Sequence, residues 1–327
     1  MTANLGWFFD EKQGARGTII PEYHIMIPID THALHYGTLV FEGIKAYRAG
    51  AQAEARLGRG VPGRVIFRLD DHLARFMESA DLYHLGTLPF TLEVLREACV
   101  RVFAANRDDN YCRPIIFRGA GIMVNPLNSK ICAAVITRQW PAYVDPKGVR
   151  VHLSGRRRGG RDREPHDLVD AKGAGNYPVS SVAKAEALAR GFDEALLLAP
   201  DGRHLAEGSA MNLMLVEGND LVVADRASCR LDGITQRTIC ELYAEDGSIH
   251  ERPIRTDDLW RADEVFLVGT AAEVVPVLAC DGRSVGRTRP GQIGPVTEAL
   301  ARRYREVVTG ERIYRADWLT FVPDYTE

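Results

Sequence analysis

The sequence predicts an α+β protein of two domains, and three observations lead to that prediction. The chain has 327 residues, more than the roughly 100–200 of a single domain. Its composition, 46% hydrophobic and 26% charged, suits a globular protein with a sizeable core. Strand-like and helix-like segments occur in both halves, separated by a proline- and glycine-containing stretch. We therefore expect a smaller α+β domain over 1–138, a linker over 139–148 and a larger domain over 149–327.

In the first half, apolar residues at helical spacing predict two helices. One begins at Asp70-Asp71 and ends near His84, and the other follows Thr91, whose hydroxyl suits an N-cap. Segments rich in β-branched residues predict strands at Val65–Arg68, Pro114–Phe117 and Ile131–Thr137.

In the second half, short apolar segments bounded by turn residues predict strands. The turns Pro200-Asp201-Gly202 and Glu217-Gly218-Asn219-Asp220 favour antiparallel meanders. The expected strands are Glu194–Ala199, Asn212–Val216, Leu221–Ala224 and Glu264–Val268. The expected helices are Tyr177–Arg190, Thr235–Ala244 and Gly294–Val308.

The charge and the cysteines argue against several classes of protein. A net charge of −3 gives no overall field that favours nucleic acid or an anionic membrane. No apolar run is long enough to span a bilayer, and Met1–Arg16 does not resemble a signal peptide, so we expect a cytosolic protein. The cysteines lack CxxC spacing, which favours reduced thiols over zinc or disulfides. They are Cys99, Cys112, Cys132, Cys229, Cys240 and Cys280.

Lysine is rare, with six residues, so each candidate amine nucleophile can be considered separately. Lys172 differs from the others because small residues surround it in the segment 168–177, which leaves room for a flat ligand against the backbone. An amine that attacks a carbonyl must lose its proton, and partial desolvation encourages that loss. From this segment alone, a flexible surface loop is the commoner explanation.

Two glycine-containing turns could bind an anion. Gly233-Ile234-Thr235 opens an expected helix, where free backbone N–H groups and the helix dipole favour a phosphate, although Thr235 could simply be an N-cap. Gly269-Thr270 follows an expected strand and offers similar groups. Glu207, before a turn of small residues, and Arg68, at a strand end, are individually compatible with solvated surface charges.

Together these segments resemble the fold-type IV family of pyridoxal phosphate enzymes, and most closely its branched-chain amino acid aminotransferases. The resemblance spans nearly the whole chain and implies a D-amino acid aminotransferase-like fold, with the cofactor in the cleft between two domains. The segments that carry it are Thr31–Ile44, Tyr111–Pro114, Ala171-Lys172 through Asn176-Tyr177, Glu207-Gly208, Gly233-Ile234-Thr235 and Gly269–Glu273.

The resemblance implies a role for each cofactor residue. Lys172 is the Schiff-base lysine and moves the proton between the substrate and the cofactor. Glu207 faces the pyridine nitrogen and keeps it protonated, so that the ring accepts electrons. Arg68 binds the phosphate and Tyr177 the phenolic oxygen. The remaining cofactor-binding residues that it implies are Gly233, Ile234, Thr235, Gly269 and Thr270.

The resemblance also implies a substrate pocket and an assembly. Aromatic walls would bury an aliphatic side chain, worth about 0.8 kcal/mol per CH₂, and Arg113 with Lys45 would meet the second carboxylate of glutamate. The implied reaction passes the amino group of leucine, isoleucine or valine to 2-oxoglutarate. A neighbouring subunit completes the site in the family, which implies a homodimer or larger assembly. The pocket residues are Tyr36, Phe41, Gly43, Tyr111, Arg113, Trp140, Thr270 and Ala271.

Three departures from the family pattern affect the substrate more than the cofactor. Met123 stands where glycine is common, Met211 stands where an acidic residue is common, and the segment Ser154–Glu164 carries five arginines. We interpret that segment as a solvated interdomain loop.

Other functions remain open at this point. The same cofactor could serve a D-amino acid or amine transaminase or an aminodeoxychorismate lyase, and an inactive cofactor-binding relative is conceivable. The arginines of 156–163 could bind nucleic acid, but the total charge is negative and no aromatic residues lie among them. A metal site is not expected, because His32-Ala33-Leu34-His35 lacks the spacing of a zinc-binding helix.

Overall fold

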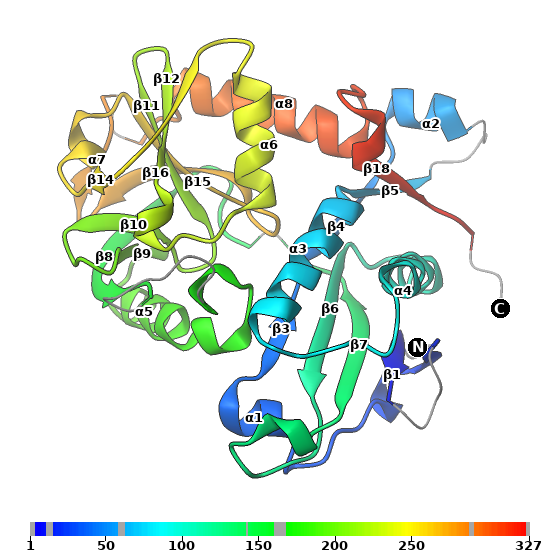
Figure 1. Cartoon of the computed structure of the whole chain (residues 1–327). Helices are drawn as coiled ribbons and strands as arrows, with labels where there is room; N and C mark the ends of the chain where they lie inside the picture. The colour runs from blue at the N-terminus through cyan, green and yellow to red at the C-terminus, as the bar shows by residue number, and fades with distance from the viewer. Residues whose placement is uncertain are drawn as a thin grey trace. The chain divides into compact units, whose positions relative to one another are not determined.

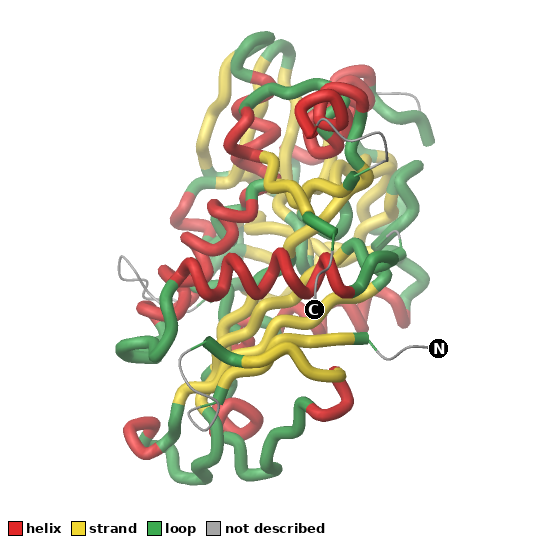
Figure 2. Tube along the Cα trace, turned by 90° about the vertical axis from the view of Figure 1, so that its right-hand side faces the viewer, coloured by secondary structure: helices red, strands yellow, loops and turns green. Residues whose placement is uncertain are grey.

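The computed structural model describes residues 4–10, 16–57, 63–141, 143–159, 168–287 and 291–324. The chain forms two compact units. The first unit comprises Met1–Pro141, Ala171–Gly175 and Glu306–Glu327, and the second comprises Ala142–Asp170 and Asn176–Arg305. Helices and strands are both prominent along the chain, as Figure 2 shows. No helix within these ranges is long and apolar enough to cross a membrane.

This division differs from the expected domains in two places. The first change of unit, between Pro141 and Ala142, falls inside the expected linker 139–148. However, Ala171–Gly175, with Lys172, belongs to the first unit, because Gly173 forms a β-bridge with Val40. The C-terminal segment also returns to the first unit, because its last strand pairs with Arg64–Phe67. The expectation that 149–327 forms one domain carrying the lysine is therefore corrected.

The first unit is built on one antiparallel sheet. Its order is β18 (Leu319–Val322), β5 (Arg64–Phe67), β4 (Ile44–Arg48), β6 (Tyr111–Arg118), β7 (Ile131–Arg138), β1 (Leu5–Phe9) and β2 (Thr18–Pro21), with β3 (Leu39–Phe41) paired to β6. Its helices are α1 (His32–Tyr36), α2 (Ala51–Leu57), α3 (Leu69–Leu82) and α4 (Leu92–Ala105).

Side-chain alternation divides this sheet into a well-covered face and a thinly covered face. Ile116 of β6 and Val135 of β7 belong to the main core, together with buried residues of α3 and α4, which lie beside the strands in Figure 1. The neighbouring Phe117 and Ala134 point the other way and form a much smaller cluster with Phe8. The strands are apolar on both faces, which predicts that something must cover the second face.

The second unit contains a closed ring of six strands. Hydrogen-bonded pairing runs from β11 (Asn212–Glu217) through β15 (Glu264–Gly269), β16 (Glu273–Cys280), β8 (Val149–Arg157), β9 (Glu194–Leu198) and β10 (His204–Gly208) back to β11. The closing pair is Glu207 with Asn212. On β9, Ala195 and Leu197 pack with α5 residues outside, so Leu196 faces the ring interior with the larger core.

Further elements extend this ring. The remaining strands are β12 (Asp220–Ala224), β13 (Ser248–Arg252), β14 (Ile254–Arg255) and β17 (Arg283–Ser284). The helices are α5 (Pro178–Ala189), α6 (Ile234–Tyr243), α7 (Asp258–Arg261) and α8 (Pro295–Thr309), of which the residues up to Arg305 belong to this unit.

Most expected helices and strands occur within a few residues of their expected bounds, and two differences affect the site. Thr91 caps α4 as expected, its hydroxyl accepting from the Val94 N–H at 3.4 Å. The helix expected from Asp70-Asp71 begins earlier, at Leu69, because Arg68 adopts a left-handed backbone conformation as its N-cap. β10 was not expected, because its polar residues mask the alternation typical of strands.

A buried ion-pair network joins α3 to the turn after β3. The Glu42 carboxylate is fully buried and accepts two hydrogen bonds from Arg75, at 2.7 and 2.9 Å. Nδ1 of His72 lies 2.8 Å from the same carboxylate. Burial alone would raise the pKa of Glu42, but the Arg75 charge and the His72 hydrogen bond hold it below its ordinary value. Burial lowers the pKa of His72, despite Glu42 beside it.

Both shifts make acid destabilise the first unit. A depressed pKa in the folded state means that the unfolded chain binds the proton more readily. The His72 contribution is present above its ordinary pKa of 6.5 and is lost as the pH falls below that value. The Glu42 contribution is present above 4.5 and is lost as the pH falls further, through its folded pKa.

We expect Glu42→Gln to lower the free energy of unfolding at pH 7 by about 3–5 kcal/mol, because it removes the negative charge from a buried ion pair. Urea denaturation at pH 7 measures this loss, and a series of measurements below pH 4.5 measures the acid dependence that Glu42 contributes, which the variant should lack. The control is Glu97→Gln, which removes an exposed partner of Arg101 and should change little. Equal stability of the two variants would contradict the structural role of Glu42.

Candidate active site

The backbone around Lys172 is held on both sides. Its N–H donates to the Ser79 hydroxyl of α3 at 3.0 Å, and its carbonyl accepts from the Phe41 N–H at 3.1 Å. Gly173 bridges to Val40, and a Cβ at Gly173 would overlap the Tyr83 ring. The segment is therefore fixed in place rather than a flexible surface loop. The Lys172 side chain is half-buried, with Nζ 4.9 Å from the centre of the Phe41 ring.

Five of the expected substrate residues form one cluster in the first unit. Two cations lie over the Phe41 ring: the Lys172 ammonium, and the Arg113 guanidinium at 4.6 Å from the ring centre. Arg113 donates to the Tyr111 hydroxyl at 2.8 Å, and this hydroxyl lies against Gly43. The Tyr111 and Trp140 rings are 4.7 Å apart. These contacts place an aromatic surface and one cation beside the amine.

Tyr36 does not join this cluster through any contact among the described residues. It is 43% exposed at the end of α1, and its hydroxyl donates to the Ile122 carbonyl at 2.7 Å. Met123, next in that loop, is also exposed. Lys45, expected beside Arg113, has its ammonium over the Tyr47 ring at 5.0 Å.

Arg68, at the start of α3, is buried and carries an ordered guanidinium. Its Nε lies 2.6 Å from Asp71, and its guanidinium carbon lies 4.5 Å from the centre of the Trp318 ring. Its carbonyl accepts from the N–H of His72, which contacts Glu42. The helix that positions Arg68 is therefore the helix that fixes the Glu42 turn.

Glu207 is a buried carboxylate in the strand that closes the ring of the second unit. Its Oε2 accepts from the Asn212 side chain and from the Leu231 N–H, each at 3.1 Å. Its Oε1 lies 2.7 Å from Nε of Arg158. With both oxygens engaged, the carboxylate has one fixed orientation.

Arg158 is the residue that the sequence interpretation missed. The arginine-rich segment was expected to be a solvated loop, but Arg156 and Arg157 end β8 and Arg158 is buried, with its Nη1 donating to the Asn176 carbonyl at 3.1 Å. Arg156, which pairs with Glu186, and Arg157 are both exposed and fit the solvated expectation. Arg161 and Arg163 lie outside the described residues. No local pattern distinguishes Arg158 from its neighbours, because its partner is 49 positions away in the chain.

The other expected cofactor segments of the second unit lie close to Glu207. Asn212 pairs with Glu207 on one side and with Val268, just before Gly269, on the other. Its side chain occupies the position that a Cβ on Gly233 would need. The Thr270-Ala271 turn follows Gly269 between β15 and β16, and Met211 is buried in the core beside it. Tyr177 precedes α5 as its N-cap.

These groups fit the chemistry of an aromatic aldehyde that carries a phosphate. The first unit offers the fixed amine of Lys172 and the buried cation Arg68. The second unit offers the Glu207 carboxylate and the start of α6, where Gly233 supplies no side-chain cap for the first N–H groups. Uncapped N–H groups at a helix start bind phosphate well. The donor set therefore agrees with pyridoxal phosphate.

Comparisons with known proteins agree with this chemistry. The family model described as amino-transferase class IV matches residues 39–280. The branched-chain-amino-acid aminotransferase of Pseudomonas aeruginosa is 34% identical over 299 residues, covering 89% of this chain and 91% of that protein.

Two solved structures are similar over almost the whole chain. Both are of the T.th. branched-chain amino acid aminotransferase, with a TM-score of 0.84, and each covers 99% of this chain and 100% of that one. One is complexed with N-(5'-phosphopyridoxyl)-L-glutamate at 37% identity, and the other with 4-methylvaleric acid at 36% identity. With a model match over most of its length, this chain belongs to the class IV amino-transferases.

Proposed function

We propose that this chain catalyses reversible amino transfer from L-leucine, L-isoleucine or L-valine to 2-oxoglutarate, with pyridoxal 5'-phosphate as cofactor. The observation that carries the proposal is the fixed Lys172 amine beside an aromatic surface and a single arginine. The family and the relatives support the same reaction. When bound, the cofactor supplies an aldehyde that receives the amino group and a ring that accepts electrons.

In the first unit, we assign the chemical steps to Lys172. Its Nζ would hold the cofactor aldehyde carbon and, as the acid–base group, would take the proton from the substrate Cα and deliver it to that cofactor carbon. The Ser79 and Phe41 hydrogen bonds fix its backbone, so only its side chain moves. Arg68 binds the phosphate through charge-assisted hydrogen bonds.

In the second unit, we assign electrostatic control to Glu207. Its carboxylate would accept a hydrogen bond from the protonated ring nitrogen, and the contacts from Asn212, Leu231 and Arg158 hold the carboxylate in place. Tyr177 donates to the phenolic oxygen. The N–H groups of Ile234 and Thr235, with Gly233, Gly269 and the Thr270 hydroxyl, would offer an anion site in this unit.

The pocket must accept both an aliphatic side chain and a carboxylate. Phe41, Tyr111 and Trp140 offer apolar surface, while Arg113 offers a cation that its tyrosine contact holds against the Phe41 ring. The two T.th. complexes, one with a glutamate adduct and one with a branched aliphatic acid, support this dual use. We propose that Gly43, which lies against the Tyr111 hydroxyl, also lines the substrate pocket, and that Thr270 and Ala271 contribute to substrate binding.

We expect the purified protein, loaded with cofactor, to react with L-leucine, L-isoleucine, L-valine and L-glutamate in single half-reactions. Loss of the bound cofactor's absorption band measures each half-reaction, and steady-state rates should give ping-pong kinetics. Turnover of D-alanine or an arylalkyl amine, but of none of the branched L-amino acids, would replace the proposal by a different class IV reaction.

The matched variants for this assay are Glu207→Gln and Glu217→Gln. Glu207→Gln should retain the cofactor but slow the leucine half-reaction by about a hundredfold or more, because it loses the negative charge opposite the ring. Glu217 lies in the adjacent strand and pairs with Arg252 near the surface, so its variant should behave as the wild type. Equal rates for both would remove Glu207 from the mechanism.

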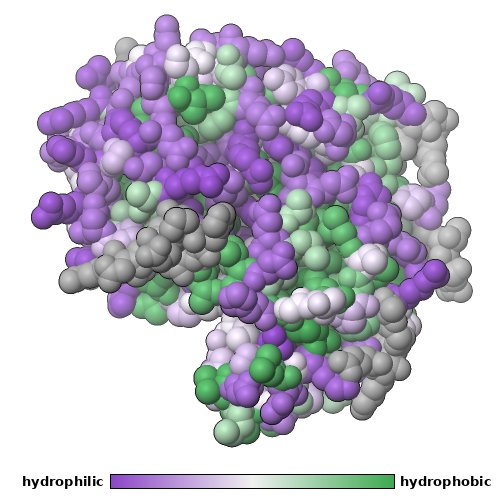
Figure 3. Space-filling view, in the orientation of Figure 1, coloured by the Kyte–Doolittle hydropathy of each residue, from purple (hydrophilic) through white to green (hydrophobic). Residues whose placement is uncertain are grey.

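We further propose that two copies of the chain associate through the thinly covered face of the first unit. Apolar side chains are exposed around α1, where Figure 3 shows hydrophobic surface, and in the loop after β6. Met26, Ile29 and Leu127 are each about four-fifths exposed, at 79%, 86% and 81%. Such a patch is unusual on a monomer.

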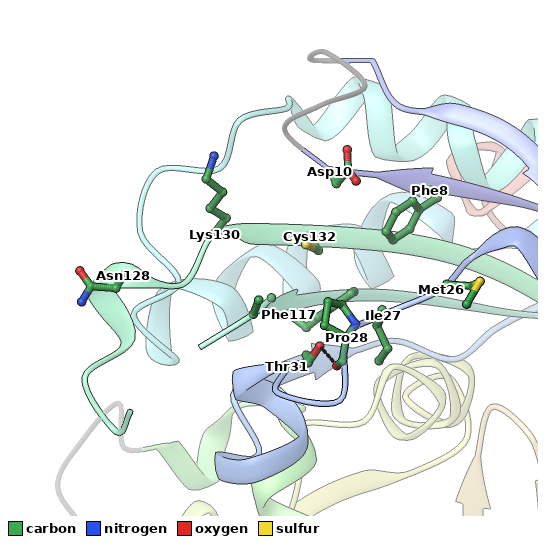
Figure 4. A pocket seen from close by; sticks show the side chains of 12 residues that line it. Phe8, Asp10, Met26, Ile27, Pro28, Thr31, Phe117, Asn128, Lys130 and Cys132 are labelled. Atoms are coloured by element: carbon green, nitrogen blue, oxygen red, sulfur yellow. Dashed lines mark hydrogen bonds between the residues drawn. The ribbon is translucent and has the colours of Figure 1, made fainter. Parts of the chain in front are cut away.

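Two cavities lie on this face and support the same proposal. One, of about 390 Å³, is lined by Phe8, Phe117 and the Met26–Pro28 segment, whose side chains Figure 4 shows. The other, of about 450 Å³, is lined mainly by aliphatic residues around Leu34. A second copy would cover this surface. The exposed Tyr36 would then line the substrate pocket of the partner.

We expect light scattering to give a mass near twice 36.3 kDa. Ile29→Glu combined with Leu127→Glu should yield a monomer with little activity, because a buried charge opposes association. The control is Leu188→Glu, which changes an equally apolar, exposed residue on α5 and should leave the mass unchanged. A fully active wild-type monomer would contradict the proposal.

A further inference from the structure

We infer that Trp318, near the C-terminus, is a positioning residue for Arg68, and that the C-terminal segment thereby controls how tightly the cofactor phosphate binds. The inference rests on the proposed function, because it takes Arg68 as the phosphate ligand. Trp318 and Arg68 are 250 positions apart but belong to the same unit.

Arg68 has a backbone conformation that its surroundings must impose. Its φ of 50° and ψ of 41° lie in the left-handed region, which residues with a side chain seldom adopt. Such a conformation persists only where neighbouring contacts determine it. The Arg68 N–H donates to the Trp318 carbonyl at 2.6 Å, and the Arg68 carbonyl accepts from His72 at 3.1 Å. Trp318 therefore fixes the turn from which the arginine side chain departs.

Trp318 also fixes the guanidinium itself. The guanidinium carbon lies 4.5 Å from the centre of the indole ring, a distance typical of a cation–π contact. Asp71, 2.6 Å from Nε, holds the same guanidinium through a charge-assisted contact. The ring and the carboxylate thus restrain the guanidinium together.

Trp318 is in turn held by the C-terminal strand. β18 begins at the next residue and pairs with β5, with Leu319 opposite Phe67, the residue before Arg68. The Phe67 and Trp318 rings meet edge to face at 5.7 Å, and the Tyr314 ring packs against Trp318 at 5.4 Å. Trp318 is only 2% exposed. The strand pairing and the ring contacts thus place the indole under the arginine as part of one rigid unit.

If Trp318 only fills the core, its substitution should weaken the binding of both ligands alike. If it positions Arg68, its substitution must weaken the binding of the phosphate in particular. This difference provides the test. Apo-protein prepared from the full chain is titrated with pyridoxal phosphate and with pyridoxal, which lacks the phosphate. The ratio of the two dissociation constants reports the phosphate contribution alone.

We expect Trp318→Leu to weaken pyridoxal phosphate binding by about tenfold and pyridoxal binding by less than about twofold. Trp318→Phe, which keeps an aromatic face, should fall in between. Arg68→Ala should lower the preference for the phosphate form, and Trp318→Leu in the Arg68→Ala background should lower it no further. The control is Trp260→Leu, which removes the stack between Trp260 and Arg283 in the second unit and should leave the preference unchanged.

The inference is overturned if Trp318→Leu weakens both ligands equally, or if Trp318→Phe binds both as the wild type does while Trp318→Leu does not fold. Thermal unfolding of each apo-protein identifies a variant that fails to fold. A wild type that binds neither ligand would overturn the proposed function instead, so the two failures are distinguishable.

Discussion

The backbone attachment of the Lys172 segment to β3 is the interaction on which the rest of the site depends. The Gly173–Val40 bridge and the Phe41–Lys172 hydrogen bond attach a short segment of the chain to the edge of the first unit's sheet. The same strand presents Phe41 to the amine and leads directly into Glu42. In the role proposed for it, the Lys172 amine forms a bond, releases it and moves a proton, and this attachment gives that amine a fixed starting point.

In each unit, a buried carboxylate paired with a buried arginine fixes part of the proposed site. In the first unit Glu42 with Arg75 holds the turn beside Phe41, and in the second Glu207 with Arg158 holds an acid in one orientation. Buried ion pairs contribute little net stability, because both charges lose their water. Here they serve to fix the positions of side chains, because removing one partner of a buried pair leaves a buried charge uncompensated and is strongly destabilising.

Sequence reasoning predicted what is local and missed what depends on long-range pairing. The helices, the Thr91 cap and the glycine turns follow from neighbouring residues, and the order of the motifs was enough to indicate the family. Arg158 and the packing of Trp318 on Arg68 depend on partners far apart in the chain, which one sequence does not reveal. The same cause moved Lys172 into the first unit, because the strand partner of the next residue, Gly173, is Val40.

The central claim is that Lys172 alone carries the cofactor. Borohydride reduction of the loaded protein, followed by digestion and mass spectrometry of the peptides, tests it most directly, because reduction makes the link permanent. We predict one pyridoxyl-labelled peptide, which contains Lys172, and no label after prior conversion of the cofactor with L-leucine. Label on Lys45, Lys184 or another side chain, or no label at all, would contradict the account.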